Sequence, residues 1–190
     1  LEHVTSDPHA FLQELGRVSK KGIFLSTPNK ETWIRAKQML TKEPQTIDWL
    51  NTLEDGQTFW DIGANVGTFS LYAASIRNAT VLSFEPIYNT YALLVENILV
   101  NRLAARVSPY CFAFSDHTGI GTWHVEHWEA GSSDHQIDSS TNIGGLPHQY
   151  HTTLNILCNT IDDFIEYCSL KVPSHIKIDV DGGESNILRG

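Results

Sequence analysis

One short stretch, Thr58 to Phe69 (TFWDIGANVGTF), constrains the fold of this chain more than any other. Its apolar first half predicts a buried strand, and the apolar spacing that follows predicts a helix, so a tight turn must join the two. Gly63 lacks a Cβ, which lets the chain turn sharply and lets a ligand lie against its backbone. Gly67 is expected to let the helix pack close to the strand. The stretch therefore predicts the strand–turn–helix unit of a nucleotide-binding sheet.

Polar side chains stand at the ends of the first two predicted strands, at the edge where open α/β sheets bind their ligands. Asp61 ends the first strand, and Glu85 follows a second strand predicted over 80–84. The 24 residues between these acids are close to the spacing at which nucleotide-binding folds place a carboxylate on the ribose hydroxyls. Pro86 fixes the backbone just after it. Glu85 is thus expected to bind a ribose, and the alternative is a solvent-exposed acid.

A third strand is predicted over 107–114, and it ends in Ser115 and Asp116. Because these side chains also follow a strand end, they are placed to reach an adenine ring. Asp116 precedes His-Thr-Gly, however, and that order is equally good turn chemistry. The third strand end therefore indicates either an adenine contact or a turn.

The last informative stretch, His175 to Glu184 (HIKIDVDGGE), begins as a strand. Alternation places its Ile and Val side chains on one face, so Lys177 and Asp179 share the other and emerge near the ligand edge. These two residues either form a partly buried ion pair or take part in chemistry at that edge. With the three earlier strand ends, this stretch predicts an α/β protein with a doubly wound, Rossmann-like sheet.

Composition narrows the class of protein and of partner. The 190 residues are 41% hydrophobic, which suffices for a domain with a core. A net charge of −9 argues against a nucleic-acid partner, because phosphate-backbone binders need clustered Lys and Arg. The absence of a long apolar run or a basic leader predicts no membrane partner. Cys111, Cys158 and Cys168 form no CxxC pattern, so we expect buried thiols and a cytoplasmic setting.

Residues 129–150 read as a long loop rich in Gly, Ser, Asn and His, and a loop of that length in a domain is usually either functional or disordered. Histidines concentrate in and around it, at His117, His124, His127, His135, His148 and His151. Residues three apart in a strand point to opposite faces, so His124 and His127 cannot chelate one ion without a bend. We therefore expect no metal site and prefer a substrate-facing loop.

Several of these stretches resemble motifs of one enzyme family. The turn DIGANVG is similar to the first motif of class I S-adenosylmethionine-dependent methyltransferases, in the form found in the FkbM-type family. The family's later motifs resemble the triplet 84–86 with the helix that ends at Asn101, the run 113–116, and the run 176–184. The resemblance covers about residues 57–190. It departs from the family at Asp181, where Glu is usual, and at Gly183, where Ala is usual.

The resemblance implies methyl transfer from S-adenosylmethionine to a hydroxyl of a sugar, polyketide or related small molecule. A hydroxyl must lose its proton, and Asp179 or Glu184 could accept it with Lys177 orienting the carboxylate, while a loop histidine is a rival base. It also implies the cofactor-binding residues Asp61, Gly63, Ala64, Asn65, Gly67, Glu85, Pro86, Ser115 and Asp116.

Two alternatives to a methyltransferase stay open. The altered DVDGGE run would suit a non-catalytic binding module that keeps the cofactor fold. An NAD-linked oxidoreductase is opposed by the G-x-N-x-G spacing, which differs from the G-x-G-x-x-G of dinucleotide enzymes. The sequence leaves the oligomeric state open.

The domain organisation follows from the same motifs. Residues 1–29 resemble the later part of another class I methyltransferase, and the alternative is an N-terminal extension; residues 30–56 are then a linker and leading helix before the domain at 57–190. In the family, further strands follow the position of Gly190. We expect those strands to be missing here, and Ile187 and Leu188 to lose part of their packing as a result.

Overall fold

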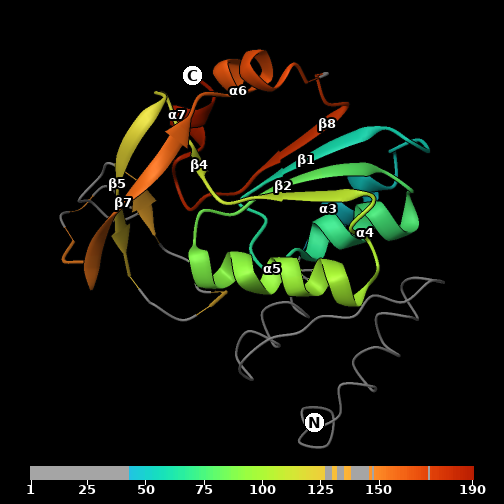
Figure 1. Cartoon of the computed structure of the whole chain (residues 1–190), viewed down its shortest axis with the longest axis horizontal. Coiled ribbons are helices and arrows are strands. Elements are labelled where there is room, and N and C mark those ends of the chain that lie inside the picture. The colour runs from blue at the N-terminus through green and yellow to red at the C-terminus, as the bar shows by residue number, and fades with distance from the viewer. Residues whose placement is uncertain (1–42, 127–129, 132–134, 138–145, 147, 171) are drawn as a thin grey trace, which may run out of the picture.

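The computed structural model describes residues 43–126, 130–131, 135–137, 146, 148–170 and 172–190. The expectations for residues 1–29 and 30–42, and most of those for the histidine-rich loop, lie outside the described residues. The described chain forms two sheets, and helices cover both faces of the larger one (Figure 1).

The larger sheet has four parallel strands in the order β3-β2-β1-β8. These strands are β1 (Thr58–Ile62), β2 (Thr80–Phe84), β3 (Val107–Tyr110) and β8 (His175–Ile178). The chain steps outward from β1 to β3 and then returns to the free side of β1, so the strand order reverses between β1 and β8. Ligands of open α/β sheets bind outside the carboxyl ends at such a switch point. The predicted doubly wound, Rossmann-like α/β fold is confirmed.

Three helices lie on one face of this sheet and two on the other (Figure 1). The first group is α3 (Pro44–Leu50), α4 (Thr68–Ile76) and α5 (Tyr88–Val100), and the second is α6 (Ile161–Cys168) and α7 (Glu184–Ile187). Strand β1 serves both faces by alternation, since Phe59 packs on the first side and Trp60 on the second. Burial on both faces explains why its sequence is an almost continuous apolar run.

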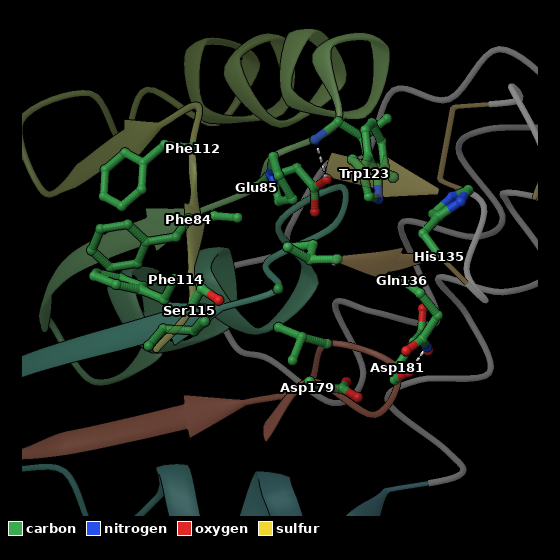
Figure 2. Close-up of a pocket in the computed structure, with 18 of the residues that line it drawn as sticks. Phe84, Glu85, Phe112, Phe114, Ser115, Trp123, His135, Gln136, Asp179 and Asp181 are labelled. Atoms are coloured by element: carbon green, nitrogen blue, oxygen red, sulfur yellow. Dashed lines mark hydrogen bonds between the residues drawn. The ribbon is translucent and has the colours of Figure 1, made fainter. Parts of the chain in front are cut away.

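The core beneath α6 and α7 is largely aromatic. Trp60 stacks on Phe114 with ring centroids 6.1 Å apart, and Phe84 meets Phe114 edge to face at 4.7 Å. Phe164 of α6 closes the cluster at 5.5 Å from Phe84. Figure 2 shows Phe84, Phe112 and Phe114 side by side. Offset and edge-to-face pairs of this kind add stability beyond their buried area, so this cluster fixes the position of the strand ends.

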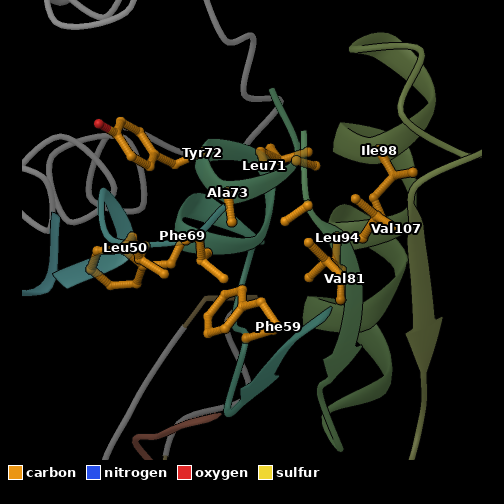
Figure 3. Packing of buried hydrophobic residues seen from close by; sticks show 14 of the residues in the cluster. Leu50, Phe59, Phe69, Leu71, Tyr72, Ala73, Val81, Leu94, Ile98 and Val107 are labelled. Carbon is orange, nitrogen blue, oxygen red and sulfur yellow. The ribbon is translucent and has the colours of Figure 1, made fainter. Parts of the chain in front are cut away.

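The core on the opposite face is mainly aliphatic (Figure 3). It joins α3, α4 and α5 to the sheet through the fully buried side chains Leu50, Phe59, Phe69, Leu71, Val81, Leu94 and Val107. Because α3 contributes Leu50 to this core, the predicted leading helix is part of the domain it precedes.

The smaller sheet corrects the prediction of one third strand over 107–114. Its order is β4-β7-β5-β6, formed by β4 (Ala113–Phe114), β5 (Gly119–Val125), β6 (Gln136–Ile137) and β7 (Thr152–Asn159). The predicted strand divides at Cys111 and Phe112, because β3 pairs with β2 in the larger sheet whereas β4 pairs with β7 in the smaller one. Ser115 and Asp116 therefore follow β4 and not β3.

Two further expectations on burial are partly wrong. Cys158 is buried as predicted, but Cys111 and Cys168 are exposed. Ile187 is only 2% exposed because it packs into the aromatic core, whereas Leu188 is 74% exposed. Among the described residues, no helix is long and apolar enough to cross a bilayer.

The packing of the sheet depends on Gly63, where the chain leaves β1 with φ of +76°. A Cβ at this position would overlap the backbone oxygen of Asp179, which cannot move without shifting β8. We expect Gly63→Ala to lower the free energy of unfolding by at least about 3 kcal/mol, measured by chemical denaturation.

Gly56→Ala is the matched control, because Gly56 has φ of +77° and nothing within 4 Å of the added Cβ. Gly56→Ala should lower the free energy of unfolding only by the strain of a left-handed alanine, about 1–2 kcal/mol. Equal losses in the two variants would show that the contact with Asp179 is unimportant.

Candidate functional site

A cavity opens at the carboxyl ends of β1, β2 and β8, at the switch point of the larger sheet. Its walls come from both sheets (Figure 2). The larger sheet contributes Gly63, Glu85 and Asp179, and the smaller sheet contributes Trp123 and Gln136. The cavity therefore lies where parallel α/β sheets bind ligands, with a second wall that the sheet itself does not supply.

Glu85 is the central polar group of this cavity. The side chain is only 4% exposed, and its two carboxylate oxygens accept hydrogen bonds of 2.9 Å from the backbone N–H groups of Asn65 and Ile87. Burial raises the pKa of Glu85 from 4.5 to about 7, although these two hydrogen bonds oppose the shift. The strand end thus holds a buried carboxyl that titrates near neutral pH.

The turn after β1 is fixed from three directions. The N–H groups of Gly63 and Ala64 both donate to the carbonyl of Phe84 at 3.0 Å, which ties the turn to the end of β2. Asn65 adopts a left-handed φ of +51°, which Asn tolerates better than most residues. The buried Asn97 of α5 donates from Nδ2 to the carbonyl of Val66 at 2.9 Å. A rigid loop results.

Glycine is required at position 67 for a different reason from the one expected. Its φ is +91°, and a Cβ would lie 2.5 Å from Cδ1 of Leu94. Gly67 therefore lets α5 approach the start of α4, whereas the sequence suggested close packing of helix on strand.

One end of the cavity is apolar, with Phe84, Phe112 and Phe114 on its wall and Ser115 beside them. Pro86 also lines the cavity, directly after Glu85. Asp116 is turned away toward α7, where its carboxylate is 3.4 Å from Nη2 of Arg189. Ser115 thus lines the cavity, whereas Asp116 forms an ion pair on the surface, and the adenine contact stays a prediction.

Beneath the cavity, Lys177 joins two carboxylates. Its Nζ donates to Asp179 Oδ2 at 2.9 Å and lies 3.6 Å from Asp61 Oδ1. Burial alone would lower the pKa of Lys177, but Asp61 and Asp179 outweigh it and raise the pKa above its ordinary value. Lys177 therefore carries a charge that holds Asp179 at the cavity edge.

Asp61 lies on the face of the sheet that α4 covers and not in the cavity. Its side chain is fully buried and accepts a 2.6 Å hydrogen bond from Ser70 Oγ of α4, which in turn accepts one from Ser83 Oγ at 2.7 Å. Asp61 thus anchors Lys177 and α4 from below.

Glu184 organises the turn that follows β8. Its Oε1 accepts hydrogen bonds from the N–H groups of Val180 and Gly182, at 3.2 and 3.3 Å. The turn also contains Asp181 in a left-handed conformation with φ of +56°. Glu184 thereby stabilises the loop that carries Asp179 and Asp181.

The second wall comes from β5 and β6. Trp123 meets the ring of His135 edge to face at 5.1 Å, and His135 Nδ1 accepts from the N–H of Glu126 at 3.1 Å. A neutral ring in this arrangement carries its proton on Nε2. Gln136 reaches across the cavity and donates from Nε2 to the backbone oxygen of Asp181, which bridges the two sheets (Figure 2).

The histidines do not gather into a metal site within the described part of the chain. His148 Nε2 lies 2.6 Å from Glu126 Oε2, and His124 packs beside Tyr150. His127 lies outside the described residues.

The cavity brings together only some of the residues singled out from the sequence. Those on its wall are Gly63, Asn65, Glu85, Pro86, Ser115 and Asp179. The others support this wall from behind or lie beside it, namely Asp61, Ala64, Gly67, Asp116, Lys177 and Glu184.

Three residues of the site, Asn97, Trp123 and Gln136, were not predicted from the sequence. The sequence contained an indication for Asn97, because it follows Leu94 by three residues and directly precedes Ile98 on the apolar face of a helix. A polar group buried there needs a hydrogen-bond partner. The sequence contained none for Trp123 and Gln136, since their place depends on how the smaller sheet lies against the larger one.

The ion pairs of Lys177 with Asp61 and Asp179, which lie under the cavity, can be tested through their effect on stability. Lys177→Met would leave the buried Asp61 without its cation, and we expect a loss of about 3–5 kcal/mol in chemical denaturation. Asp179→Asn removes a half-exposed partner of the same lysine and should cost below about 1 kcal/mol. The double variant Asp61→Asn/Lys177→Met should regain part of the loss. A small cost for Lys177→Met alone would contradict the anchoring role.

Comparison with known proteins shows which family this chain resembles. Residues 61–190 match the family model described as the methyltransferase FkbM domain. A hexuronic acid methyltransferase, AglP of Haloferax volcanii, is 27% identical over 143 residues, which cover 74% of this chain and 52% of that protein. Methyltransferase 1 of Beauveria bassiana is 23% identical over 141 residues, covering 68% and 56%. The chain thus spans about half the length of the curated relatives it matches.

Solved structures share smaller parts of the chain. A putative transferase from Pyrococcus horikoshii has a TM-score of 0.34 at 28% identity, covering 36% of this chain and 26% of that one. The N-terminal domain of human METTL16 has a TM-score of 0.35 at 16% identity, covering 56% and 44%. With the family model matched from Asp61 to the last residue, the chain belongs to the FkbM methyltransferase family.

Proposed function

We propose that this methyltransferase domain uses S-adenosylmethionine to methylate a hydroxyl of a sugar or related small molecule. The observation that carries the proposal is the buried carboxyl of Glu85 at the switch point, beside the turn that begins at Gly63. A carboxylate at a second strand end can accept both hydroxyl protons of a ribose, and a glycine turn lets a ligand approach the backbone.

The residues on the cavity wall fit this cosubstrate. Glu85 would hold the ribose, and Phe112 and Phe114 offer apolar faces for an adenine next to Ser115. The turn of Gly63 and Asn65 borders the space between this end and Asp179. When bound, S-adenosylmethionine supplies an electrophilic methyl group on a sulfonium.

Asp179 is the residue we assign to proton removal. Its carboxylate lines the cavity at the end of β8, and Lys177 orients it by a 2.9 Å hydrogen bond. Lys177 itself is protonated and cannot accept a proton, and Glu184 is turned to the amides of its own loop. In its neutral form with Nδ1 accepting, His135 is set to donate from Nε2. Asp179 is therefore the best placed base.

The acceptor class rests on the relatives. AglP is named for a hexuronic acid, which supports a sugar hydroxyl as the acceptor here. The second wall, with Trp123 and Gln136, would contact the acceptor because the phenylalanines that would hold the adenine lie at the other end of the cavity (Figure 2).

Calorimetric titration of S-adenosylmethionine, S-adenosylhomocysteine and NAD side by side tests the cosubstrate. We expect the two adenosyl ligands to bind and NAD to bind at least about a hundredfold more weakly, because no dinucleotide glycine pattern follows β1. Tight binding of NAD, or no binding of either adenosyl ligand, would refute the proposed function.

The raised pKa of Glu85 predicts a pH dependence of that binding. Ribose hydroxyls donate to the ionised carboxylate, so binding must expel a proton below pH 7, where the free protein holds Glu85 protonated. The affinity for S-adenosylhomocysteine should fall as pH drops from 7 to 5.5, approaching about tenfold per unit. Glu85→Gln should flatten this profile. If the affinity of that variant still fell with pH as steeply as in the wild type, Glu85 would not be the group that binds the ribose.

Asp179→Asn tests the base, using the full-length protein and a panel of glycosides as acceptors. Turnover should fall by about a hundredfold or more, while affinity for S-adenosylhomocysteine stays within a few-fold. Asp48→Asn removes the same charge from the exposed side of α3 and should leave turnover unchanged. Full activity of Asp179→Asn would return Asp179 to a purely structural role.

A further inference from the structure

One row of buried polar side chains crosses the larger sheet beneath the cavity. The strand register places Ser83 of β2 beside Asp61 of β1, and Asp61 beside Lys177 of β8. Ser70 of α4 joins this row, since it donates to Asp61 Oδ2 at 2.6 Å and accepts from Ser83 Oγ at 2.7 Å. All four side chains are buried. The row reaches the cavity through the hydrogen bond from Lys177 to Asp179.

The two carboxylates beside Lys177 are bonded to it unequally. Its Nζ donates to Asp179 Oδ2 at 2.9 Å, whereas Asp61 Oδ1 lies 3.6 Å away, beyond the usual hydrogen-bond distance. Within the described part of the chain, the buried Asp61 Oδ1 has no hydrogen-bond donor. Leaving such an oxygen unbonded is costly and calls for an explanation. A movement of Lys177 Nζ by less than about 1 Å would supply the donor.

Lys177 stays charged whichever carboxylate it bonds. Burial would lower its pKa, but Asp61, Asp179 and, to a smaller extent, Glu43 outweigh burial and raise the pKa. Nζ also lies 5.2 Å from the centroid of the Phe69 ring, whose face attracts a cation without fixing its direction. The ammonium group can therefore bond to either of its two carboxylate neighbours.

We propose that Asp61 is a positioning residue for the base, a second hydrogen-bond partner to which Lys177 moves when Asp179 takes the proton of the substrate hydroxyl. This inference rests on the proposed role of Asp179. In that step the hydroxyl proton passes to Asp179, the hydroxyl oxygen bonds to the methyl carbon, and the electron pair of the broken carbon–sulfur bond stays on sulfur. Asp179 becomes neutral and loses its attraction for the ammonium group, while Asp61 keeps its charge.

The second carboxylate lowers the cost of that proton transfer. Without Asp61, protonation of Asp179 would leave the nearly buried Lys177 without a carboxylate in contact, and an unpaired buried charge is strongly unfavourable. With Asp61 in place, one charge-assisted hydrogen bond replaces another. Ser70 holds Asp61 Oδ2, so the oxygen that faces Lys177 stays in position. Proton uptake at the cavity is thus compensated inside the sheet.

A crystal structure of Asp179→Asn, in the full-length protein without ligands, tests the movement of Lys177 against wild-type crystals. Asparagine has the shape of the neutral, protonated carboxyl, so the distance from Lys177 Nζ to Asp61 Oδ1 should shorten from 3.6 Å to about 2.9 Å. The variant is expected to fold, because Asp179 is half-exposed. An unmoved Lys177, or a water molecule that bonds Asp61 Oδ1 in its place, would overturn the inference.

Glu43→Gln is the matched control, because it removes another negative charge that acts on Lys177, with a smaller effect. In this variant Lys177 Nζ should stay within hydrogen-bond distance of Asp179. If Lys177 moved to Asp61 here as well, its movement would not depend on the charge of Asp179, and the inference would be overturned.

Asp61→Asn tests the contribution to catalysis. Its side chain can still accept from Ser70 but no longer balances the ammonium charge, so kcat should fall by about tenfold or more. The KM for the substrate and the affinity for S-adenosylhomocysteine should stay within a few-fold, because the loss falls on the proton-transfer step alone. Ser83→Ala removes a hydroxyl of the same row without removing a partner of Lys177, and should keep kcat within about threefold.

The outcomes separate this inference from the proposed function. An unchanged kcat in Asp61→Asn, or equal losses of kcat and affinity, would overturn the positioning role and leave the proposed function intact. Full turnover by Asp179→Asn would overturn the proposed base and this inference with it. If Asp61→Asn fails to fold, the position of Lys177 in the crystals of Asp179→Asn decides the inference by itself.

Discussion

The contact between the backbone of Gly63 and the carbonyl of Asp179 is the constraint on which the site depends. It brings the turn after β1 against the end of β8 with no side chain between them. The amides of Gly63 and Ala64 then bond to Phe84 at the end of β2. Three strand ends are thus locked by main-chain contacts, and Glu85 and Asp179 reach the cavity from fixed positions.

The parallel strands of the larger sheet and their polar ends could be predicted because local patterns determine them. Two glycines and an apolar run specify the first unit whatever surrounds them. The division of residues 107–114 could not be predicted, because β4 is defined by pairing with β7, about 45 residues later in the chain. The smaller sheet, and with it the wall of Trp123 and Gln136, is a product of such long-range pairing.

The roles of individual side chains also differ in how far the sequence predicts them. Strand alternation already places Asp61 on the same face as Phe59, so its position under α4 follows from the pattern once the faces are distinguished. For Lys177 and Asp179 the sequence left an ion pair and a place at the ligand edge as alternatives. The structure contains both, since one lysine bonds to the cavity-lining Asp179 and to the buried Asp61. The residue of α5 that donates to the turn after β1 is Asn97, one helical turn before the Asn101 that ends the helix of the family motif.

The smaller sheet is an insertion within the connection that carries the chain from β3 back to β8. Helix α6 completes that connection, while the smaller sheet projects to one side of it (Figure 1). Strands β4, β5 and β6 of this sheet contribute residues to the cavity wall. A connection of this kind can change in length and sequence without disturbing the strands it joins. The two walls of the cavity are therefore free to evolve separately, so that one half of the site can be kept while the other is exchanged.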